Sequence, residues 1–262
     1  MTQQESPTPL IIAHRGARDQ APDNTRSSFE LALKHPVDGI ELDVQMTADG
    51  VPVLFHDRTL FSILQRRQRL STLKYSELAD YDWGAWFDPA FTGEPLLTLH
   101  QTLRLLGSRT RLLIEIKSRP HEQRSGRVYE LARKVAAMPA DPGYRVAQDA
   151  IYILSFDPKV LEIAHRTAPQ WRYVLNVSEK EPNMIMSAPA ESLAFLWAVD
   201  IKISKLTADL VQWARRHRLR VFTYTCNSRR QVHSAMNLGV DGILTDRPGW
   251  LTEYLGRRNC FL

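Results

Sequence analysis

The sequence has 262 residues and a formal net charge of +5, and 44% of its residues are hydrophobic and 24% charged. This composition excludes disordered, collagen-like and coiled-coil proteins. No stretch approaches the ~18 consecutive apolar residues of a membrane-spanning helix. The length fits either two small domains or one α/β barrel.

The N-terminal sequence MTQQESPTPL has neither the basic segment nor the apolar segment of a secretory signal. Cys226 and Cys260 are too few for a disulfide framework and do not form a paired metal-binding motif. We therefore expect two reduced thiols in a cytoplasmic protein that does not insert stably into membranes.

The basic charge, with an isoelectric point near 9.3, raises the possibility of an anionic partner. The arginines form two main clusters, Arg66, Arg67 and Arg69, and then Arg215, Arg216, Arg218 and Arg220. The second cluster ends a predicted amphipathic helix, where cations complement the helix dipole. Because no nucleic-acid recognition motif accompanies them, we interpret most of these arginines as solvated surface and expect no nucleic-acid partner.

Short apolar runs alternate along the chain with segments of helical periodicity, which is typical of βα units and a parallel sheet. The predicted strands are Leu10–Ala13, Gly39–Val44, Arg111–Ile116, Ile151–Leu154, Arg172–Val177, Asp200–Ile203, Arg220–Thr225 and Gly242–Leu244. The predicted helices are Thr25–Lys34, Leu99–Leu106, Glu122–Met138, Pro158–Arg166, Glu191–Trp197, Ala208–His217, Arg229–Leu238 and Gly249–Leu255. A helix after nearly every strand predicts a (β/α)8 TIM barrel that takes up residues 1–262 as a single domain.

One segment, residues 58–95, breaks this alternation, after a short apolar run at Val51–Phe55. It is rich in aromatic residues without clean periodicity, so we predict a small inserted subdomain after the second strand, folded over the barrel mouth. Two roles remain open for its aromatic side chains, which are packing and shaping a pocket for the leaving group of a substrate.

Polar residues recur at the predicted carboxyl ends of the strands, where barrel enzymes place their chemistry. Glu41 and Asp43 are two residues apart, so their side chains share one face of a strand, and Glu115 lies on the next barrel strand. An all-carboxylate set suits Mg²⁺ or Ca²⁺ better than zinc. The alternative from spacing alone is a layer of ion pairs with Arg15 and Lys117, and the two interpretations stand level.

Two histidines follow apolar runs, His14 after the first strand and His56 just before Asp57. A pair of histidines near neutral pKa can deprotonate a nucleophile and protonate a leaving oxygen. Arg15 offers a planar fork for phosphate oxygens, and Lys117 adds a compact positive charge.

The pieces IIAHRGA, PDNT, GIELDVQMTADGVPVLFHD, LLIEIK, ILSFD, VFTYTCN and GVDGILTDRP resemble, in order and over nearly the full chain, the glycerophosphodiester phosphodiesterase family. Family members are metal-dependent TIM barrels that hydrolyse glycerophosphodiesters to glycerol 3-phosphate and an alcohol. The resemblance implies one divalent cation held by Glu41, Asp43 and Glu115. It also implies an acid and base pair, His14 and His56. A glycerol hydroxyl attacks phosphorus first in the implied route, giving a cyclic phosphate that water opens.

The sequence departs from the family pattern in the outer wall of the pocket. The stretch FSILQRRQRL follows Asp57 where relatives carry an arginine-threonine and glycine-rich segment, and Tyr224 stands where many carry tryptophan. Asn24 and Thr25 match a family pair but equally suit the start of a helix. These departures leave the preference for the alcohol open.

The resemblance predicts an enzyme acting on small-molecule glycerophosphodiesters such as glycerophosphocholine and glycerophosphoethanolamine, with Arg15 and Lys117 contacting the phosphate. A first alternative is a lysophospholipase D, for which the FSIL segment could supply an apolar groove. A second alternative is a non-catalytic barrel that binds phosphate esters. The sequence does not distinguish Mg²⁺ from Ca²⁺ and does not predict an oligomeric state.

Overall fold

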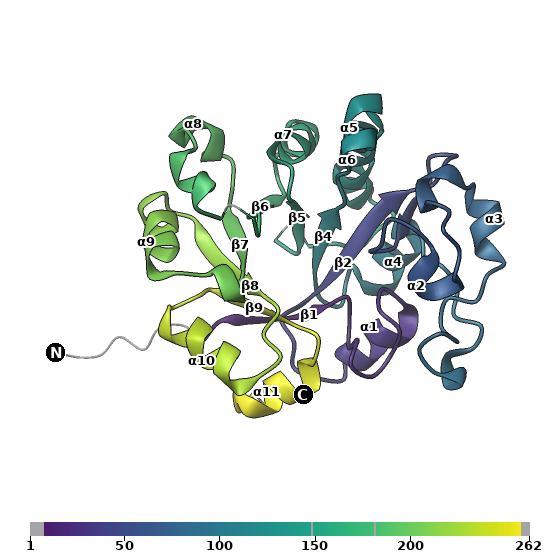
Figure 1. Cartoon of the computed structure of the whole chain (residues 1–262), viewed down its shortest axis with the longest axis horizontal. Helices are drawn as coiled ribbons and strands as arrows, with labels where there is room; N and C mark the ends of the chain where they lie inside the picture. Colours follow the sequence, from purple (N-terminus) through teal and green to yellow (C-terminus); the bar gives the residue numbers. More distant parts are fainter. Residues whose placement is uncertain (1–7, 148, 181, 258–262) are drawn as a thin grey trace.

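The computed structural model describes residues 8–147, 149–180 and 182–257. Its strands form a closed parallel barrel, with helices arranged around it (Figure 1). The strands of the described residues are β1 Leu10–His14, β2 Gly39–Met46, β3 Pro52–Leu54, β4 Arg111–Ile116, β5 Ile151–Ser155, β6 Arg172–Asn176, β7 Ala198–Lys202, β8 Arg220–Tyr224 and β9 Gly242–Thr245. The predicted (β/α)8 TIM barrel is therefore confirmed.

The barrel closes because β1 pairs in parallel with both β2 and β9. From β9 the parallel order continues through β8, β7, β6, β5 and β4 back to β2, and β3 is added antiparallel to β2. The carboxyl ends of the parallel strands thus meet at one face of the barrel, so the polar residues that follow different strands are brought together.

Helices and short turns of helix connect the strands. The α-helices are α1 Arg26–Ala32, α2 Phe61–Leu64, α3 Tyr75–Ala79, α4 Leu99–Leu106, α5 Pro120–Ser125, α6 Arg127–Ala137, α7 Pro158–Thr167, α8 Ala190–Leu193, α9 Ala208–Arg216, α10 Arg229–Asn237 and α11 Pro248–Tyr254. The 3-10 helices are η1 Leu70–Thr72, η2 Pro89–Phe91, η3 Met138–Ala140, η4 Pro182–Ser187 and η5 Ile203–Lys205. In the described part of the chain, no helix is both long and apolar enough to cross a bilayer.

Beyond small shifts of their ends, the structure differs from the sequence-based elements at four places. Val51–Phe55, which was not predicted as a strand, contains β3. The predicted helix Glu122–Met138 is two helices, because Gly126 adopts a left-handed backbone with φ of +77° between them. The sixth barrel strand, β7, begins at Ala198 rather than Asp200, and the helix predicted at Glu191–Trp197 is the shorter α8, Ala190–Leu193. The uninterrupted apolar run between them carries no mark of where the helix ends.

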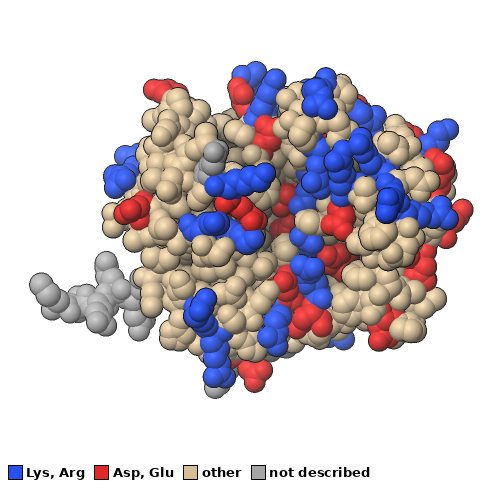
Figure 2. All heavy atoms as spheres, viewed as in Figure 1, with Lys and Arg blue, Asp and Glu red and all other residues tan. Residues whose placement is uncertain are grey.

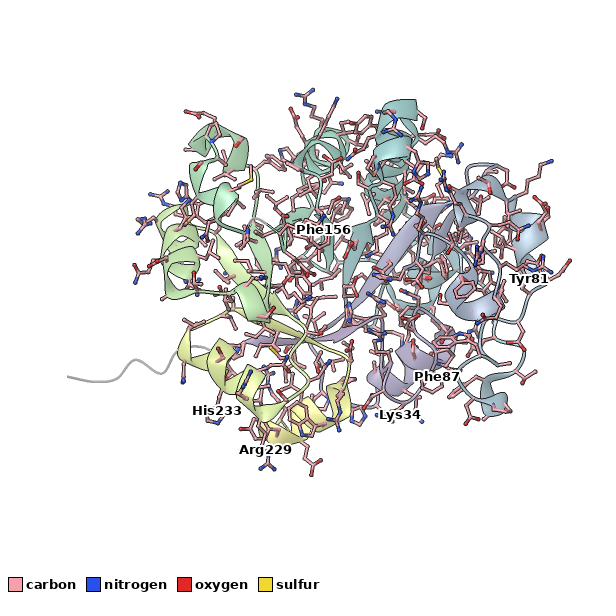
Figure 3. All side chains as sticks on the ribbon, in the orientation of Figure 1. Lys34, Tyr81, Phe87, Phe156, Arg229 and His233 are labelled. Atoms are coloured by element: carbon pink, nitrogen blue, oxygen red, sulfur yellow. The ribbon has the colours of Figure 1, made fainter. Side chains whose placement is uncertain are left out.

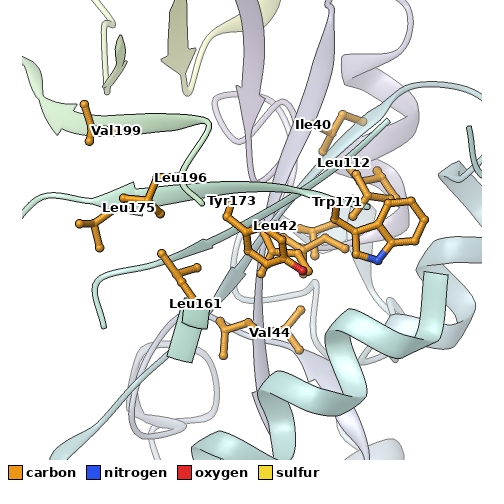
Figure 4. Close-up of a cluster of buried hydrophobic side chains, with 14 of the residues drawn as sticks. Ile40, Leu42, Val44, Leu112, Leu161, Trp171, Tyr173, Leu175, Leu196 and Val199 are labelled. Carbon is orange, nitrogen blue, oxygen red and sulfur yellow. The ribbon is translucent and has the colours of Figure 1, made fainter. Parts of the chain in front are cut away.

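Apolar side chains form separate cores inside and outside the barrel. The interior is filled by Ile12, Leu113, Tyr152, Leu154, Val174, Ala198, Phe222 and Leu244. The larger core lies between the strands and the surrounding helices, and Figure 4 shows part of it around Tyr173 and Trp171, with Leu42 and Val44 of β2 close by. Side chains at alternate positions of β2 therefore anchor the strand in this outer core, which leaves the positions between them directed inward.

The chain between β3 and α4 forms a small layer beside the barrel, at the right of Figure 1. It has its own buried cluster, in which Trp83 and Phe55 make an edge-to-face ring contact with centroids 5.5 Å apart. The other buried members of this cluster are Val53, Leu60, Leu70, Leu78 and Leu96. Because Phe55 directly precedes His56, packing in this layer helps to fix where that histidine lies.

Candidate active site

Three buried carboxylates lie together at the barrel mouth. Glu41 and Asp43 come from β2, and Glu115 comes from β4, where it is in register with Asp43. One oxygen from each lies within 4.8 Å of the others. We call Glu41, Asp43 and Glu115 the carboxylate cluster, and its geometry could hold a metal ion.

Two cations contact the carboxylate cluster. The Nε atom of Arg15 lies 2.9 Å from Oδ2 of Asp43. The Nζ atom of Lys117 lies 2.7 Å from Oδ1 of Asp43 and 2.6 Å from Oε1 of Glu115. The ion pairs that the spacing suggested as an alternative to a metal are therefore present. Of the three carboxylates, Glu41 has the least positive charge close to it to offset its own.

The charges in this cluster set opposite protonation tendencies on neighbouring acids. Burial, with repulsion from Asp43 and Glu115, raises the pKa of Glu41 well above its usual value. Burial acts on Asp43 too, but Arg15 and Lys117 outweigh it and hold the pKa of Asp43 well below its usual value. Oε1 of Glu41 is buried and has no hydrogen-bond partner. A set of oxygen ligands with one unsatisfied buried carboxylate fits a hard divalent cation.

Arg15 is directed at the cluster by a sharp turn after β1. Arg15 and Gly16 adopt left-handed backbones, with φ of +58° and +88°. A Cβ atom on Gly16 would lie 2.5 Å from the Ser28 hydroxyl and 2.7 Å from its backbone carbon. Glycine is therefore required after His14 and Arg15, because the chain passes too close to α1 at this turn to leave room for a side chain.

His14 ends β1 and is held by Asp246, the residue that follows β9. Its Nδ1 lies 2.6 Å from Oδ1 of Asp246, and its Nε2 lies 3.8 Å from the Glu41 carboxylate. Burial would raise the pKa of Asp246, but hydrogen bonds from His14 and Asn227 and the charge of Arg18 lower it. An ionised Asp246 can only accept, so the proton lies on Nδ1 and leaves Nε2 free to accept one.

His56 has the same arrangement at the outer side of the mouth. Its Nδ1 lies 2.7 Å from Oδ1 of Asp57, and this contact lowers the pKa of Asp57 to about 2. The two histidines differ in environment, since the side chain of His56 is 37% exposed and that of His14 is 12% exposed. One ring nitrogen of each remains available for proton transfer, and both histidines line the same cavity.

Several further residues contribute to the site, although the sequence did not assign them a place in it. Asn24 donates to Oδ2 of Asp43 at 2.9 Å and accepts from the Asp43 backbone at 3.1 Å, while Thr25 caps α1. Asn176 and Asp200 are register partners on β6 and β7 that line the cleft, each with a buried unpartnered oxygen. Burial, and then the charge of Glu115, raise the pKa of Asp200 well above its usual value.

A cavity of about 350 Å³ connects these groups. Its lining contains six of the seven predicted site residues, which are His14, Arg15, Glu41, His56, Glu115 and Lys117. Asp43 lies behind Arg15 and Lys117 and contacts both. Phe156 follows β5 and lies over the centre of the barrel (Figure 3), half-exposed at the edge of the cavity.

Carboxylates, cations and two histidine–aspartate pairs at the mouth of a parallel barrel define a TIM-barrel enzyme built to act on an anionic ester. The profile of the Glycerophosphoryl diester phosphodiesterase family matches residues 14–250. The chain therefore belongs to the glycerophosphodiester phosphodiesterase family, as the resemblance predicted, and this is its enzyme class.

Relatives and solved structures agree with this assignment. The chain is 30% identical to the glycerophosphodiester phosphodiesterase of Caldanaerobacter subterraneus subsp. tengcongensis, over 91% of this chain and 94% of that one. It is 27% identical to that of Bacillus subtilis, over 91% and 84%. A phosphodiesterase of Oleispira antarctica, solved with its product sn-glycerol-3-phosphate, is similar with a TM-score of 0.83 and 25% identity over 95% of this chain and 97% of that one.

Proposed function

We propose that this protein is a divalent-metal-dependent hydrolase of glycerophosphodiesters such as glycerophosphocholine and glycerophosphoethanolamine, releasing glycerol 3-phosphate and the alcohol. The observation that carries the proposal is the meeting of the carboxylate cluster, two cations and two histidines with free ring nitrogens around one cavity. The product bound in the Oleispira antarctica relative supports glycerol 3-phosphate as the retained half.

Glu41, Asp43 and Glu115 would hold one cation, Mg²⁺ or Ca²⁺, through their oxygens. When bound, such an ion neutralises charge on the phosphate oxygens and increases the electrophilicity of phosphorus. Arg15 and Lys117 then serve two purposes, because they compensate Asp43 and present N–H groups to the phosphate.

The two histidines divide the proton transfers. His14, enclosed and held by Asp246, accepts at Nε2 the proton of the attacking hydroxyl, which is either water or a glycerol hydroxyl of the substrate. His56, at the open side of the cavity, gives a proton to the departing alcohol oxygen. The difference in exposure supports this division, because the variable alcohol must leave toward solvent.

The enclosed side of the cavity suits the glycerol half of the substrate. Asn176 and Asp200 line the cavity, and each has a buried side-chain oxygen without a hydrogen-bond partner. Glycerol hydroxyls can donate to such oxygens, which would remove the cost of leaving them unsatisfied.

The decisive experiment measures glycerol 3-phosphate release from glycerophosphocholine by the purified protein, with and without a chelator. We expect His14→Ala and His56→Ala each to lower kcat/KM by roughly 10²- to 10⁴-fold, the usual contribution of general acid–base catalysis. The chelator should abolish activity, and added Mg²⁺ or Ca²⁺ should restore it. Full activity in either histidine variant would contradict the assigned roles, and activity that survives chelation would contradict the metal requirement.

A second candidate, lysophospholipase D activity, is favoured by apolar groups beside the mouth. Phe61 of α2 is 51% exposed, and none of the side chains of this helix is buried. Ile63 and Trp86 line a second opening that shares Arg15 and His56 with the main cavity. Rates on lysophosphatidylcholine and glycerophosphocholine separate the two candidates, since turnover of the lysolipid alone would replace the first proposal with the second.

The cellular location is part of the same proposal. Deacylated phospholipids are water-soluble substrates, and Cys226 is a buried free thiol, which suits a cytoplasmic enzyme of lipid and glycerol metabolism. Cys260 lies outside the described residues. Cell fractionation followed by detection of the protein tests this location.

A further inference from the structure

A group of arginines borders the open side of the cavity, where the leaving alcohol would depart. We call Arg58, Arg69, Arg119 and Arg124 the arginine rim. Figure 2 shows blue side chains gathered beside the central hollow, between the positions that α5 and α2 occupy in Figure 1. The rim thus combines a segment that follows β3 with the segment that follows β4.

Backbone pairing brings the first segment together. Thr59 and Arg69 form an isolated antiparallel bridge, and the Leu60 amide donates to the Gln68 carbonyl at 3.0 Å. Arg58 and Arg69 are therefore held close, although the exposed α2 and the turn after it separate them in sequence. The sequence-based interpretation of Arg69 as solvated surface did not include this pairing.

Arg119 connects the rim to the catalytic cavity. Its Nη2 donates to the backbone oxygen of His56 at 3.2 Å, and the residue lines the cavity together with Glu115 and Lys117. Its Nε is buried and has no hydrogen-bond partner. A group bound at the phosphate position with its alcohol on the His56 side would therefore meet Arg119 first.

The four rim arginines lie near one another, and little negative charge offsets theirs. The pKa of His121 is lowered by burial and then by Arg69, Arg58, Arg124 and Arg119, which places all four near this ring. In the described residues, no carboxylate lies within ion-pair distance of any rim arginine. The nearby Glu122 is buried; burial raises its pKa, and the charges of Arg119, Arg58 and Arg69 lower it, so it offsets part of the rim charge without forming an ion pair. Clustered arginines without ion-pair partners are a usual receptor for phosphate groups.

We propose that the arginine rim is a subsite for a negatively charged leaving alcohol, so that the substrates it favours are glycerophosphodiesters whose alcohol carries a second phosphate group. This inference rests on the proposed function and specifies its substrate class. Over the whole reaction, water is added across the bond from phosphorus to the alcohol oxygen: that bond breaks, phosphorus gains the hydroxyl and the alcohol oxygen takes a proton. The products are glycerol 3-phosphate and an alcohol that still carries its phosphate.

The test compares glycerophosphoglycerol with bis(glycerophospho)glycerol, whose leaving alcohol carries a second phosphate as part of an added glycerophospho group. Initial rates of glycerol 3-phosphate release are measured per scissile bond, because the second substrate has two equivalent ends. We expect the wild-type protein to have a kcat/KM about tenfold higher for the doubly charged substrate, mainly through a lower KM. In the double variant Arg58→Gln, Arg69→Gln this ratio should fall by about threefold to tenfold. Raising the salt concentration should lower the wild-type ratio, because exposed charges are screened.

A matched control removes two exposed arginines elsewhere. Arg216 lies at the end of α9 and Arg230 at the start of α10, and the labelled neighbour Arg229 in Figure 3 shows that α10 lies across the molecule from α5. The variant Arg216→Gln, Arg230→Gln has the same loss of charge and should keep the wild-type ratio. An equal loss in both double variants would overturn the subsite and leave only a general effect of net charge.

Two further outcomes are distinguishable. If glycerophosphoglycerol is cleaved without any preference for the second phosphate, the rim proposal is wrong while the proposed function stands. If neither diester is cleaved, the proposed function itself fails.

Sedimentation with phosphatidylglycerol vesicles completes the test. Loss of vesicle binding in the rim variant, with an unchanged substrate ratio, would identify the rim as a lipid-docking surface and overturn the proposal.

Discussion

A single carboxylate, Asp246, fixes which nitrogen of His14 can act as a base. Its oxygens accept hydrogen bonds from His14 Nδ1 at 2.6 Å and from Asn227 Nδ2 at 2.6 Å. In Asp246→Asn, an amide replaces the ionised acceptor and can itself donate to Nδ1, which would move the ring proton to Nε2. We expect kcat to fall by roughly 10²- to 10⁴-fold with KM changed less than threefold. Steady-state kinetics on glycerophosphocholine measure both.

The control for Asp246→Asn is the same change at Asp209, an exposed residue in the first turn of α9. Asp209→Asn should retain wild-type kinetics. Melting temperatures of both variants show whether the fold is intact, and an Asp246→Asn protein that is stable and fully active would refute the positioning role.

Local motifs predicted which residues belong to the site better than they predicted the hydrogen-bond partners of those residues. His14 and His56 could be found because each follows an apolar run and begins a charged motif. Asp246 lies 232 positions from His14, so only closure of the barrel through β1 and β9 brings them together. The spacing of Glu41 and Asp43 predicted a shared face, but Asn24 became a partner of Asp43 through a turn that the sequence assigned equally well to helix capping.

The turn between β1 and α1 shows how an element depends on one missing side chain. In Gly16→Ala, the new Cβ would meet Ser28 at 2.5–2.7 Å while the backbone keeps a φ of +88°. We expect a loss of about 2–4 kcal/mol, from overpacking and from the left-handed backbone. For a chain of this size, that lowers the melting temperature by about 4–16 °C, measured by circular dichroism.

Gly93→Ala separates the two causes. Gly93 also has a φ of +88°, but a Cβ there meets nothing within 4 Å. This variant should lose only the conformational part, about 1 kcal/mol. If Gly16→Ala and Gly93→Ala lowered the melting temperature equally, close approach to Ser28 would have no separate cost.

Elements with strong periodicity were predictable, and those set by tertiary contacts were not. The helix predicted at Leu99–Leu106 has those bounds in the structure, since its apolar face is regular and Thr98 caps it. The segment 58–95 offered no periodicity, because its short helices are held by the cluster around Trp83 and by turns. Its status as an inserted subdomain of a single domain spanning residues 1–262 stays a prediction.

Across the whole molecule, the net charge of +5 conceals an unequal distribution. The centre of the barrel mouth holds buried carboxylates, and the arginine rim lies beside them (Figure 2). The total charge can be counted from the sequence, but this arrangement cannot, because residues from β2, β4 and the segment after β3 converge only in the closed barrel. A divalent cation would resolve the repulsion within the carboxylate cluster, so its binding should stabilise the entire fold.

This coupling predicts a thermal shift independent of catalysis. At a metal concentration 100 times its Kd, binding contributes about 2.7 kcal/mol, which raises the melting temperature of a chain of this size by roughly 5–11 °C. Glu41→Gln removes a ligand while keeping its shape, so the metal-free protein should melt no lower than the wild type, because burial and repulsion already raise the pKa of Glu41. The shift in melting temperature that metal causes in this variant should be much smaller.

Scanning calorimetry with Mg²⁺ or Ca²⁺ titrated into chelator-treated protein measures these shifts and shows which ion binds more tightly. Equal shifts in wild type and Glu41→Gln would place the metal outside the carboxylate cluster, whereas Asp209→Asn should shift as the wild type does.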